Sequence, residues 1–175
     1  MAFKKKKFLA LLQERQACFN KTQSWESFKS SDKHKNLELL YFLSLLEDYN
    51  FWLSKNDYIQ ILNNYLHNRI IIDECRNQFR KLRFSNLKSY KNLKCDLEKF
   101  VSTNFDVNEI NIDYNPKSEG FADLIYEIQS VIDMCDSTVS YETNVKFPEQ
   151  ILFTISENSL KSQLKVYFLQ KIESY

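Results

Sequence analysis

Few side chains in this sequence have the types and the spacing that catalysis or metal binding requires. The two histidines, His34 and His67, are far apart, and neither stands in a metal-ligand spacing. Asp133 and Asp136 lie three residues apart and could share a metal ion, but with no histidine nearby a solvated helix face is the simpler interpretation. We therefore expect no metal, no cofactor and no catalysis, with an enzyme using scattered carboxylates as the alternative.

The glycine and cysteine content excludes several common motifs. The single glycine, Gly120, rules out phosphate-cradling loops of the P-loop and dinucleotide types as well as a Gly-x-Ser-x-Gly nucleophile elbow. No two of the four cysteines form a Cys-x-x-Cys pair, which favours small buried hydrophobes in a reducing compartment. The four are Cys18, Cys75, Cys95 and Cys135.

Charge is divided along the chain, although the formal net charge is only +1. The segment from Asp106 to Glu157 holds eleven acidic residues against two bases, Lys117 and Lys146, so the rest of the chain is strongly basic. Such asymmetry bears on binding partners more than on the fold.

The acidic ridge is the negative half of this pattern. In an expected helix over 119–136, Glu119, Asp123 and Glu127 recur every four residues and fall within about 80° of one another. Like charges at this spacing repel, and a basic protein partner would relieve that repulsion. An ordinary solvated face, or neutralisation by the basic half of the same chain, is the alternative. We define the ridge by five residues: Glu119, Asp123, Glu127, Asp133 and Asp136.

The positive half of the pattern is a basic ridge, which follows one face of a predicted helix and continues on the next predicted helix. A separate cluster of lysines lies at Lys4 to Lys7. Interleaved bases and aromatic residues favour nucleic-acid binding as an alternative function. A match between the two charged halves within a homo-oligomer, as in a structural or assembly subunit, is a further alternative. The ridge comprises Arg76, Arg80, Arg83, Lys88 and Lys91, with Lys81 and Lys94 beside them.

The elements that must position these residues are predicted to be helices, because one glycine and two prolines cannot supply the turns of a multi-stranded antiparallel sheet. Spacing by threes and fours predicts an antiparallel bundle of about six to eight helices, with a short extended segment near 104–114. We expect one domain over 1–175, or one with a helical N-terminal extension over 1–54. The predicted helices cover 3–19, 37–53, 56–67, 73–82, 87–101, 119–136 and 157–172.

Several residues are assigned specific structural roles in this scheme. Trp25 and Phe28 are expected to anchor the polar stretch 20–36, and Asp73 is expected to cap a helix. Ser118 is a candidate cap for the helix that follows, Pro148 suits the first turn of a short helix, and Ser156 is the expected N-cap of the last one. The inward stripes are predicted to contain Leu37, Leu40, Phe42, Leu43, Leu46, Tyr49 and Leu53 in the second helix. They contain Phe121, Leu124, Ile125, Ile128, Val131, Ile132 and Cys135 in the sixth, and Leu160, Leu164, Tyr167, Phe168 and Ile172 in the last.

Three segments resemble the bacterial self-protective colicin-D-type immunity family, over about residues 58–100 and 118–172. They are the run from Tyr58 to Phe79, the run from Gly120 through Asp133, and the run from Ile155 to Leu169. The resemblance implies a small helical bundle that presents carboxylates to the basic active site of a tRNA-cleaving nuclease toxin. On that basis Glu119, Asp123 and Glu127 would contact the toxin, with Asp133 and Asp136 beside them.

The expected function is therefore binding of a basic protein partner through the acidic ridge, without catalysis. No apolar run approaches the roughly 18 residues that a bilayer-spanning helix needs, and the apolar stretch near the N-terminus ends too early for a signal peptide. We expect a soluble protein of the cytoplasm or of an organelle stroma.

Overall fold

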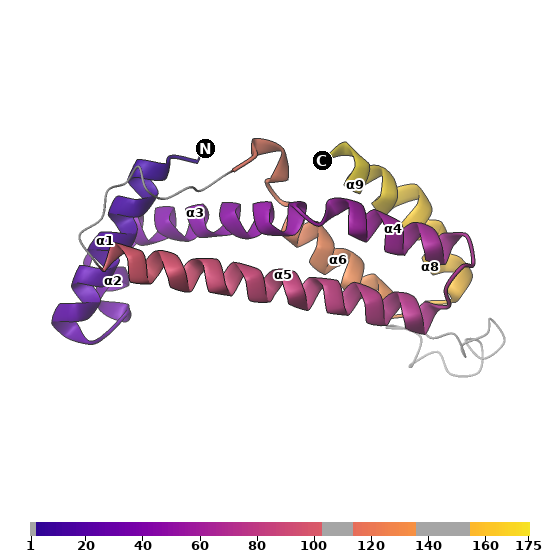
Figure 1. Cartoon of the computed structure of the whole chain (residues 1–175), viewed down its shortest axis with the longest axis horizontal. Helices are drawn as coiled ribbons and strands as arrows, with labels where there is room; N and C mark the ends of the chain where they lie inside the picture. Colours follow the sequence, from indigo (N-terminus) through magenta and orange to yellow (C-terminus); the bar gives the residue numbers. More distant parts are fainter. Residues whose placement is uncertain (1–2, 103–113, 136–154) are drawn as a thin grey trace. The chain divides into compact units, whose positions relative to one another are not determined.

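The computed structural model describes residues 3–102, 114–135 and 155–175, apart from the side chain of Tyr167, and these residues are mostly helical (Figure 1). The all-α helical bundle predicted from the sequence is confirmed. The first five helices are α1 (Lys5–Thr22), α2 (Glu26–Ser31), α3 (Lys33–Trp52), α4 (Lys55–Leu66) and α5 (Ile72–Val101). They are followed by a 3₁₀ turn η1 (Pro116–Ser118), α6 (Phe121–Asp133), α8 (Glu157–Gln163), a π-helical segment η3 (Leu164–Leu169) and α9 (Gln170–Ser174).

Two sequence predictions fall outside the described residues. The extended segment expected near 104–114 does so except for Tyr114, and the short helix expected at Pro148 does so entirely. Among the residues that are described, no helix is both long enough and apolar enough to cross a lipid bilayer.

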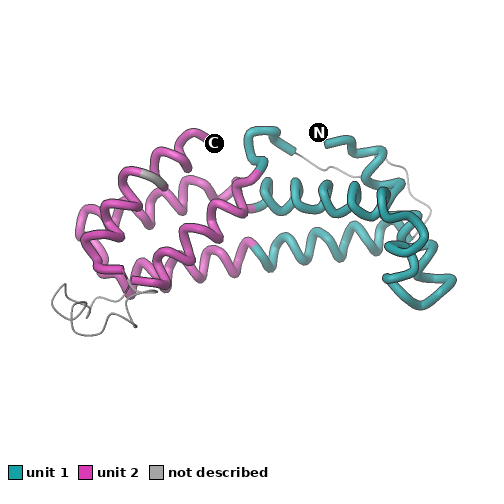
Figure 2. The backbone as a smooth tube through the Cα atoms, turned by 180° about the vertical axis from the view of Figure 1, so that it is seen from behind, with its two compact units in different colours: residues 1–50, 87–119 teal, residues 51–86, 120–175 magenta. Residues whose placement is uncertain are grey.

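Backbone contacts group the chain into two compact units, each built from two separate stretches of sequence (Figure 2). Unit 1 contains Met1–Asn50 and Leu87–Glu119, and unit 2 contains Phe51–Asn86 and Gly120–Tyr175. Helix α5 therefore contributes residues 72–86 to unit 2 and residues 87–101 to unit 1. The single-domain prediction stays a prediction.

The core of unit 1 is formed by α1, α2, α3 and the second half of α5. Phe8 and Phe42 are fully buried, and their rings meet edge to face with centroids 6.0 Å apart. Phe28 joins this core as predicted, whereas Trp25 stays 40% exposed and stacks on Phe19 at a ring separation of 3.9 Å. Burial of these large apolar side chains is the main stabilising contribution in the unit.

Unit 2 is an antiparallel bundle in which α4, the first half of α5, α6 and the C-terminal helical stretch each contact two neighbours. Residue numbers rise along one helix of each pair as they fall along the other, which defines the antiparallel order. For α4 with α5 the contacts are Ser54–Asn86 and Tyr58–Phe79, and for α5 with α6 they are Arg76–Cys135 and Arg80–Asp133. For α6 with the C-terminal stretch they are Glu127–Lys171 and Phe121–Tyr175, and for that stretch with α4 and its C-terminal turn they are Lys161–Asn68 and Lys55–Glu173.

The prediction of two helices over 73–82 and 87–101 is wrong, because α5 is continuous from Ile72 to Val101. Asn86 lies between the two predicted helices and is buried. Its side chain forms hydrogen bonds with residues at the start of α4 and just before it. Its amide nitrogen donates to the Tyr58 hydroxyl at 3.1 Å, and its amide oxygen accepts from the Ser54 hydroxyl at 3.1 Å. An asparagine satisfied in this way does not compete with the helical backbone.

Asp73 does not cap α5 as predicted but lies inside its first turn. There its carboxylate accepts from Arg76 at 2.6 Å and faces the positive end of the helix dipole. The predicted inward stripe of α3 is also partly wrong. Leu43 and Leu46 are buried, but Leu37, Leu40 and Leu53 are 55%, 52% and 63% exposed. Phe42 is buried as predicted, and the core also takes Leu39 and Leu45, which lie on a slightly rotated face.

The predicted ends of the later helices are partly confirmed. Ser156 caps α8, its hydroxyl accepting from the Ser159 backbone at 3.3 Å. Ser118 does not cap α6. It is buried and donates to the Asn115 carbonyl, while Gly120 begins the helix at φ 80°. Only glycine adopts that angle readily, and a Cβ there would lie 3.2 Å from the Tyr175 hydroxyl.

Candidate functional site

The exposed face of α6 in unit 2 carries Asp123 and Glu127, one helical turn apart. The opposite face is buried as predicted, with Phe121, Ile125 and Ile128 all at 0% exposure. The Asp123 carboxylate has no hydrogen bond or ion pair with any described residue. Glu127 pairs with Lys171 at 3.5 Å, and both side chains are more than 40% exposed, so the pair contributes little to stability.

Glu119 does not lie on this helix, contrary to the prediction of a helix over 119–136. It precedes α6 and belongs to unit 1, where its carboxylate accepts from the Tyr41 hydroxyl at 2.9 Å. Burial of the Tyr41 phenol, reinforced by the Glu119 carboxylate, raises the pKa of Tyr41 to about 12. Glu119 therefore has an internal partner.

Asp133 also has internal partners: Gln129 of α6, whose amide donates to the carboxylate at 2.9 Å, and two arginines of the predicted basic ridge. Its carboxylate accepts from Arg80 at 2.8 Å and lies 3.8 Å from the Arg76 guanidinium. Arg76 also donates to the carbonyls of Ile132 and Cys135, which closes the C-terminal end of α6. Asp136 lies outside the described residues. Asp133 of the acidic ridge and Arg76 and Arg80 of the basic ridge thus neutralise one another where α5 packs against α6.

The remaining members of the basic ridge have different surroundings. The Arg83 guanidinium in unit 2 stacks between the rings of Phe84 and Tyr126, 4.9 and 5.5 Å from their centroids. Lys88 and Lys91 belong to unit 1, are exposed, and form no ion pair with any described residue.

A groove runs beside Glu127, between α6 and the C-terminal helical stretch of unit 2. It encloses about 490 Å³ and is lined by Glu127, Val131, Ser162, Gln163, Val166 and Phe168. Phe168 is buried, whereas Val166 is 65% exposed. Both belong to the π-helical segment η3, which spans six residues.

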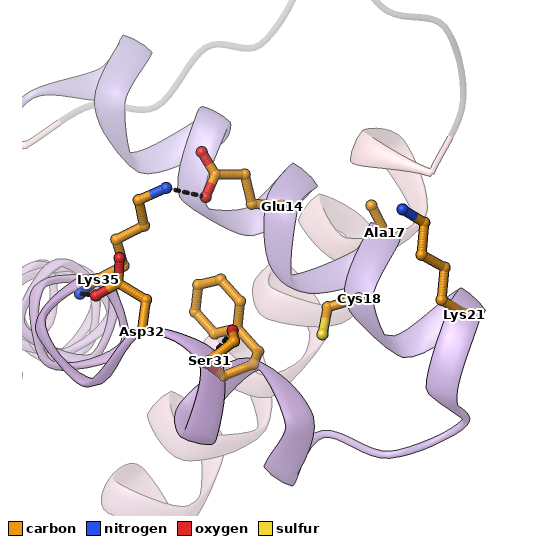
Figure 3. Close-up of a pocket in the computed structure, with 8 residues that line it drawn as sticks. Glu14, Ala17, Cys18, Lys21, Ser31, Asp32 and Lys35 are labelled. Atoms are coloured by element: carbon orange, nitrogen blue, oxygen red, sulfur yellow. Dashed lines mark hydrogen bonds and ion pairs between the residues drawn. The ribbon is translucent and has the colours of Figure 1, made fainter.

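Unit 1 contains a second groove of about 460 Å³ between α1 and the segment from α2 to the start of α3 (Figure 3). Cys18 and Phe28 line it, and charged residues surround them. The Lys35 ammonium donates to Glu14 at 2.6 Å, and this hydrogen bond is the main cause that raises the pKa of Lys35. Asp32 accepts from the Lys35 backbone and caps α3. These charges therefore satisfy one another.

The cysteines and histidines differ in their exposure and form no group suited to chemistry among the described residues. Cys75 and Cys135 are buried as expected, and burial raises the pKa of the Cys75 thiol to about 12. Cys95 is exposed, contrary to the buried role expected for all four cysteines. His67 is exposed, and its ring nitrogen Nδ1 bonds the Asn63 carbonyl. Within the described ranges, no three His, Cys, Asp or Glu residues are grouped so that they could hold a metal ion.

Neither groove was predicted from the sequence. The groove of unit 2 joins α6 to the distant residues 162–168, and the groove of unit 1 depends on how the consecutive helices within residues 14–35 turn back on one another, so no local spacing marks either groove. The π-helical segment was also missed, because the stripe from Leu160 to Ile172 fits a regular α-helix equally well.

Comparison with known proteins gives no relative: no family model, no curated protein and no solved structure matches this chain. The class that can be stated is an all-α protein whose unit 2 is an antiparallel helical bundle with an acidic helix face.

Proposed function

We propose that this protein is a non-catalytic binding protein whose unit 2 engages a basic protein partner through Asp123 and Glu127. The observation that carries the proposal is the exposed pair itself. Asp123 has no partner among the described residues, and Glu127 has only a long, exposed ion pair. The other acids of the ridge support it less, because Glu119 and Asp133 are engaged within the protein.

Binding would relieve the repulsion between the two carboxylates and would replace a weak contact with stronger ones. An interface of this kind uses charge complementarity mainly to speed and orient association. Affinity for a basic partner should therefore fall as salt is added.

The test compares two charge-reversed variants against a fluorescent amphipathic peptide of lysine and leucine, roughly 14 residues long. The double variant that carries Asp123→Lys and Glu127→Lys should bind the peptide at least about tenfold more weakly than the wild type. The control is the double variant that carries Asp57→Lys and Glu74→Lys. It makes the same charge change at exposed positions on other helices of unit 2 and should weaken binding less than about threefold. Equal losses in both variants would mean that net charge alone attracts the peptide and would refute the proposal.

A narrower form of the proposal is inhibition of a nuclease toxin, as the resemblance to the colicin-D-type immunity family implies. The tRNA-cleaving domain of such a toxin is a basic partner of the required kind. Protection of tRNA by the wild-type protein, lost in the Asp123→Lys, Glu127→Lys variant, would support it. Unchanged cleavage with wild-type protein in excess would exclude that toxin as the partner.

Nucleic-acid binding stays a second candidate because Lys88 and Lys91 of unit 1 are exposed and unpaired among the described residues. Arg76 and Arg80 no longer support it strongly, since both are engaged by Asp133. If this candidate is correct, single-stranded RNA or DNA should bind the protein at low salt. The double variant that carries Lys88→Gln and Lys91→Gln should show a shallower dependence of affinity on salt concentration, equivalent to the loss of about two phosphate contacts.

A further inference from the structure

The groove beside Glu127 combines an apolar lining with an acidic edge. Val131, Val166 and Phe168 supply the apolar surface, and the half-exposed Glu127 carboxylate lies at its border. Its volume of about 490 Å³ falls within the range of sites that hold small ligands or the anchoring side chains of a peptide.

The π-helical segment η3 exposes one apolar side chain beside the groove. A π turn holds more residues than an α turn, so the side chains of η3 are distributed differently around the axis. Leu164, Phe168 and Leu169 are buried, whereas Val166 between them is 65% exposed. π-Helical turns are rare and occur frequently at functional sites, which makes the exposed valine a candidate contact residue.

Charge identifies the kind of partner that fits. Glu127 borders the groove directly, and Asp123 lies one turn away on the same helix face. Lys171 is the cation nearest to Glu127, and its 3.5 Å pair is exposed and easily exchanged. Lys165, an exposed lysine of η3, does not line the groove. An apolar side chain flanked by lysine or arginine complements this surface.

We propose that the groove between α6 and η3 receives an aliphatic side chain from a basic amphipathic helix of the protein partner, while Glu127 binds a flanking lysine or arginine. This inference rests on the proposed function and adds the groove, the anchor and the helical form of the ligand. Recognition would follow the helix-in-groove mode, in which an amphipathic helix lays its apolar face into a hydrophobic depression.

The experiment uses the full chain and the lysine–leucine peptide, with binding followed by fluorescence anisotropy. Val166→Gln should weaken binding at least about tenfold, because it places an amide where the apolar anchor docks. The matched control is Ile71→Gln, which changes another exposed aliphatic residue of unit 2, 68% exposed, outside the groove. It should leave the affinity within about twofold. A second peptide, in which glutamine replaces every leucine, should bind the wild type more weakly than the lysine–leucine peptide does. Its affinities for the wild type and for Val166→Gln should be equal.

The outcomes separate this inference from the proposed function. If the Asp123 and Glu127 variant loses binding while Val166→Gln keeps it, the acidic face is confirmed and the groove is refuted. If Val166→Gln loses binding while the charge variant keeps it, the apolar anchor in the groove stands, but the acidic face and the role given to Glu127 are refuted. Equal losses for Val166→Gln and Ile71→Gln, or no binding of the lysine–leucine peptide to the wild type, would overturn the inference.

Discussion

Tyr58 and Tyr65 are both fully buried in unit 2, but their hydroxyl groups have different surroundings. The Tyr58 hydroxyl accepts from the Asn86 amide, whereas the Tyr65 hydroxyl has no hydrogen-bond partner among the described residues. A buried hydroxyl without a partner costs stability, and one that satisfies a neighbour contributes to it. The two tyrosines therefore form a matched pair.

Replacing Tyr58→Phe should lower the free energy of unfolding by about 1 kcal/mol, because the Asn86 amide then loses its acceptor. Tyr65→Phe should change it by less than about 0.5 kcal/mol or raise it, since it removes an unpaired hydroxyl. Urea unfolding of both variants measures the difference. A larger loss for Tyr65→Phe would show that its hydroxyl is satisfied in solution.

Asp133 and Asp123 provide a second residue-scale comparison, on the same helix. Asp133→Asn weakens the pairs with Arg80 and Arg76 and should lower the free energy of unfolding by about 1 kcal/mol, given that the carboxylate is one-third exposed. Asp123→Asn removes no contact among the described residues and should be neutral within about 0.5 kcal/mol. Identical unfolding midpoints would mean that the arginine pairs contribute nothing.

At the scale of elements, the sequence predicts most helices because their apolar residues recur with helical spacing. The stripe from Phe121 to Cys135 is confirmed at nearly every position, and the cap at Ser156 is confirmed. The continuity of α5 was missed because the residues between the two predicted apolar stripes are polar, and the lateral partners that Asn86 finds in the fold are not visible in the sequence.

The candidate site was predicted only in part, for a related reason. Helical spacing places Asp123 and Glu127 on one exposed face. It cannot show that Glu119 bonds Tyr41, that Asp133 pairs with α5, or that a groove forms beside η3, because all three depend on contacts between distant segments.

The continuity of α5 can be tested at Ser85, an exposed position in the middle of the helix. Ser85→Pro removes a backbone hydrogen bond and should lower the free energy of unfolding by about 3 kcal/mol or more. Ser85→Ala changes only the side chain and should be neutral or slightly stabilising. Circular dichroism with urea unfolding measures both. A tolerated proline would indicate two helices meeting there.

At the scale of the whole molecule, the division of charge along the sequence does not become a division between the units. Unit 1 contains 14 lysine and arginine residues against 12 acids, and unit 2 contains 10 against 11. The fold pairs the acidic helix α6 with the arginines of α5 inside unit 2. Exposed, unpaired groups are therefore a better guide to binding than the charge of the sequence segments.

Buried phenols and a buried thiol give the molecule a defined response to alkaline pH. Burial is the main cause that raises the pKa values of Tyr58 and Tyr65 well above their ordinary value, and it raises that of Cys75 to about 12. In the unfolded chain these groups ionise at about pH 8.5 to 10, so above that range the unfolded state binds fewer protons than the folded state.

The free energy of unfolding should therefore be independent of these groups below about pH 8 and should fall progressively as the pH rises through 9 to 11. Urea unfolding across this range measures the fall. The variant carrying Tyr58→Phe and Tyr65→Phe should show a shallower decline. Parallel curves for this variant and the wild type would show that the two phenols do not carry the effect.

Each unit is built from two separate stretches of sequence, and this affects how the chain folds as it is synthesised. Every stretch assigned to unit 1 has been made once residue 119 is complete, whereas unit 2 needs Tyr175 as well. Until α6 and the C-terminal helices emerge, Phe79 on the first half of α5 can pack against Tyr58 of α4 but lacks the rest of unit 2. The nascent chain thus passes through a stage with an exposed apolar helix, a stage at which chaperones act and aggregation begins.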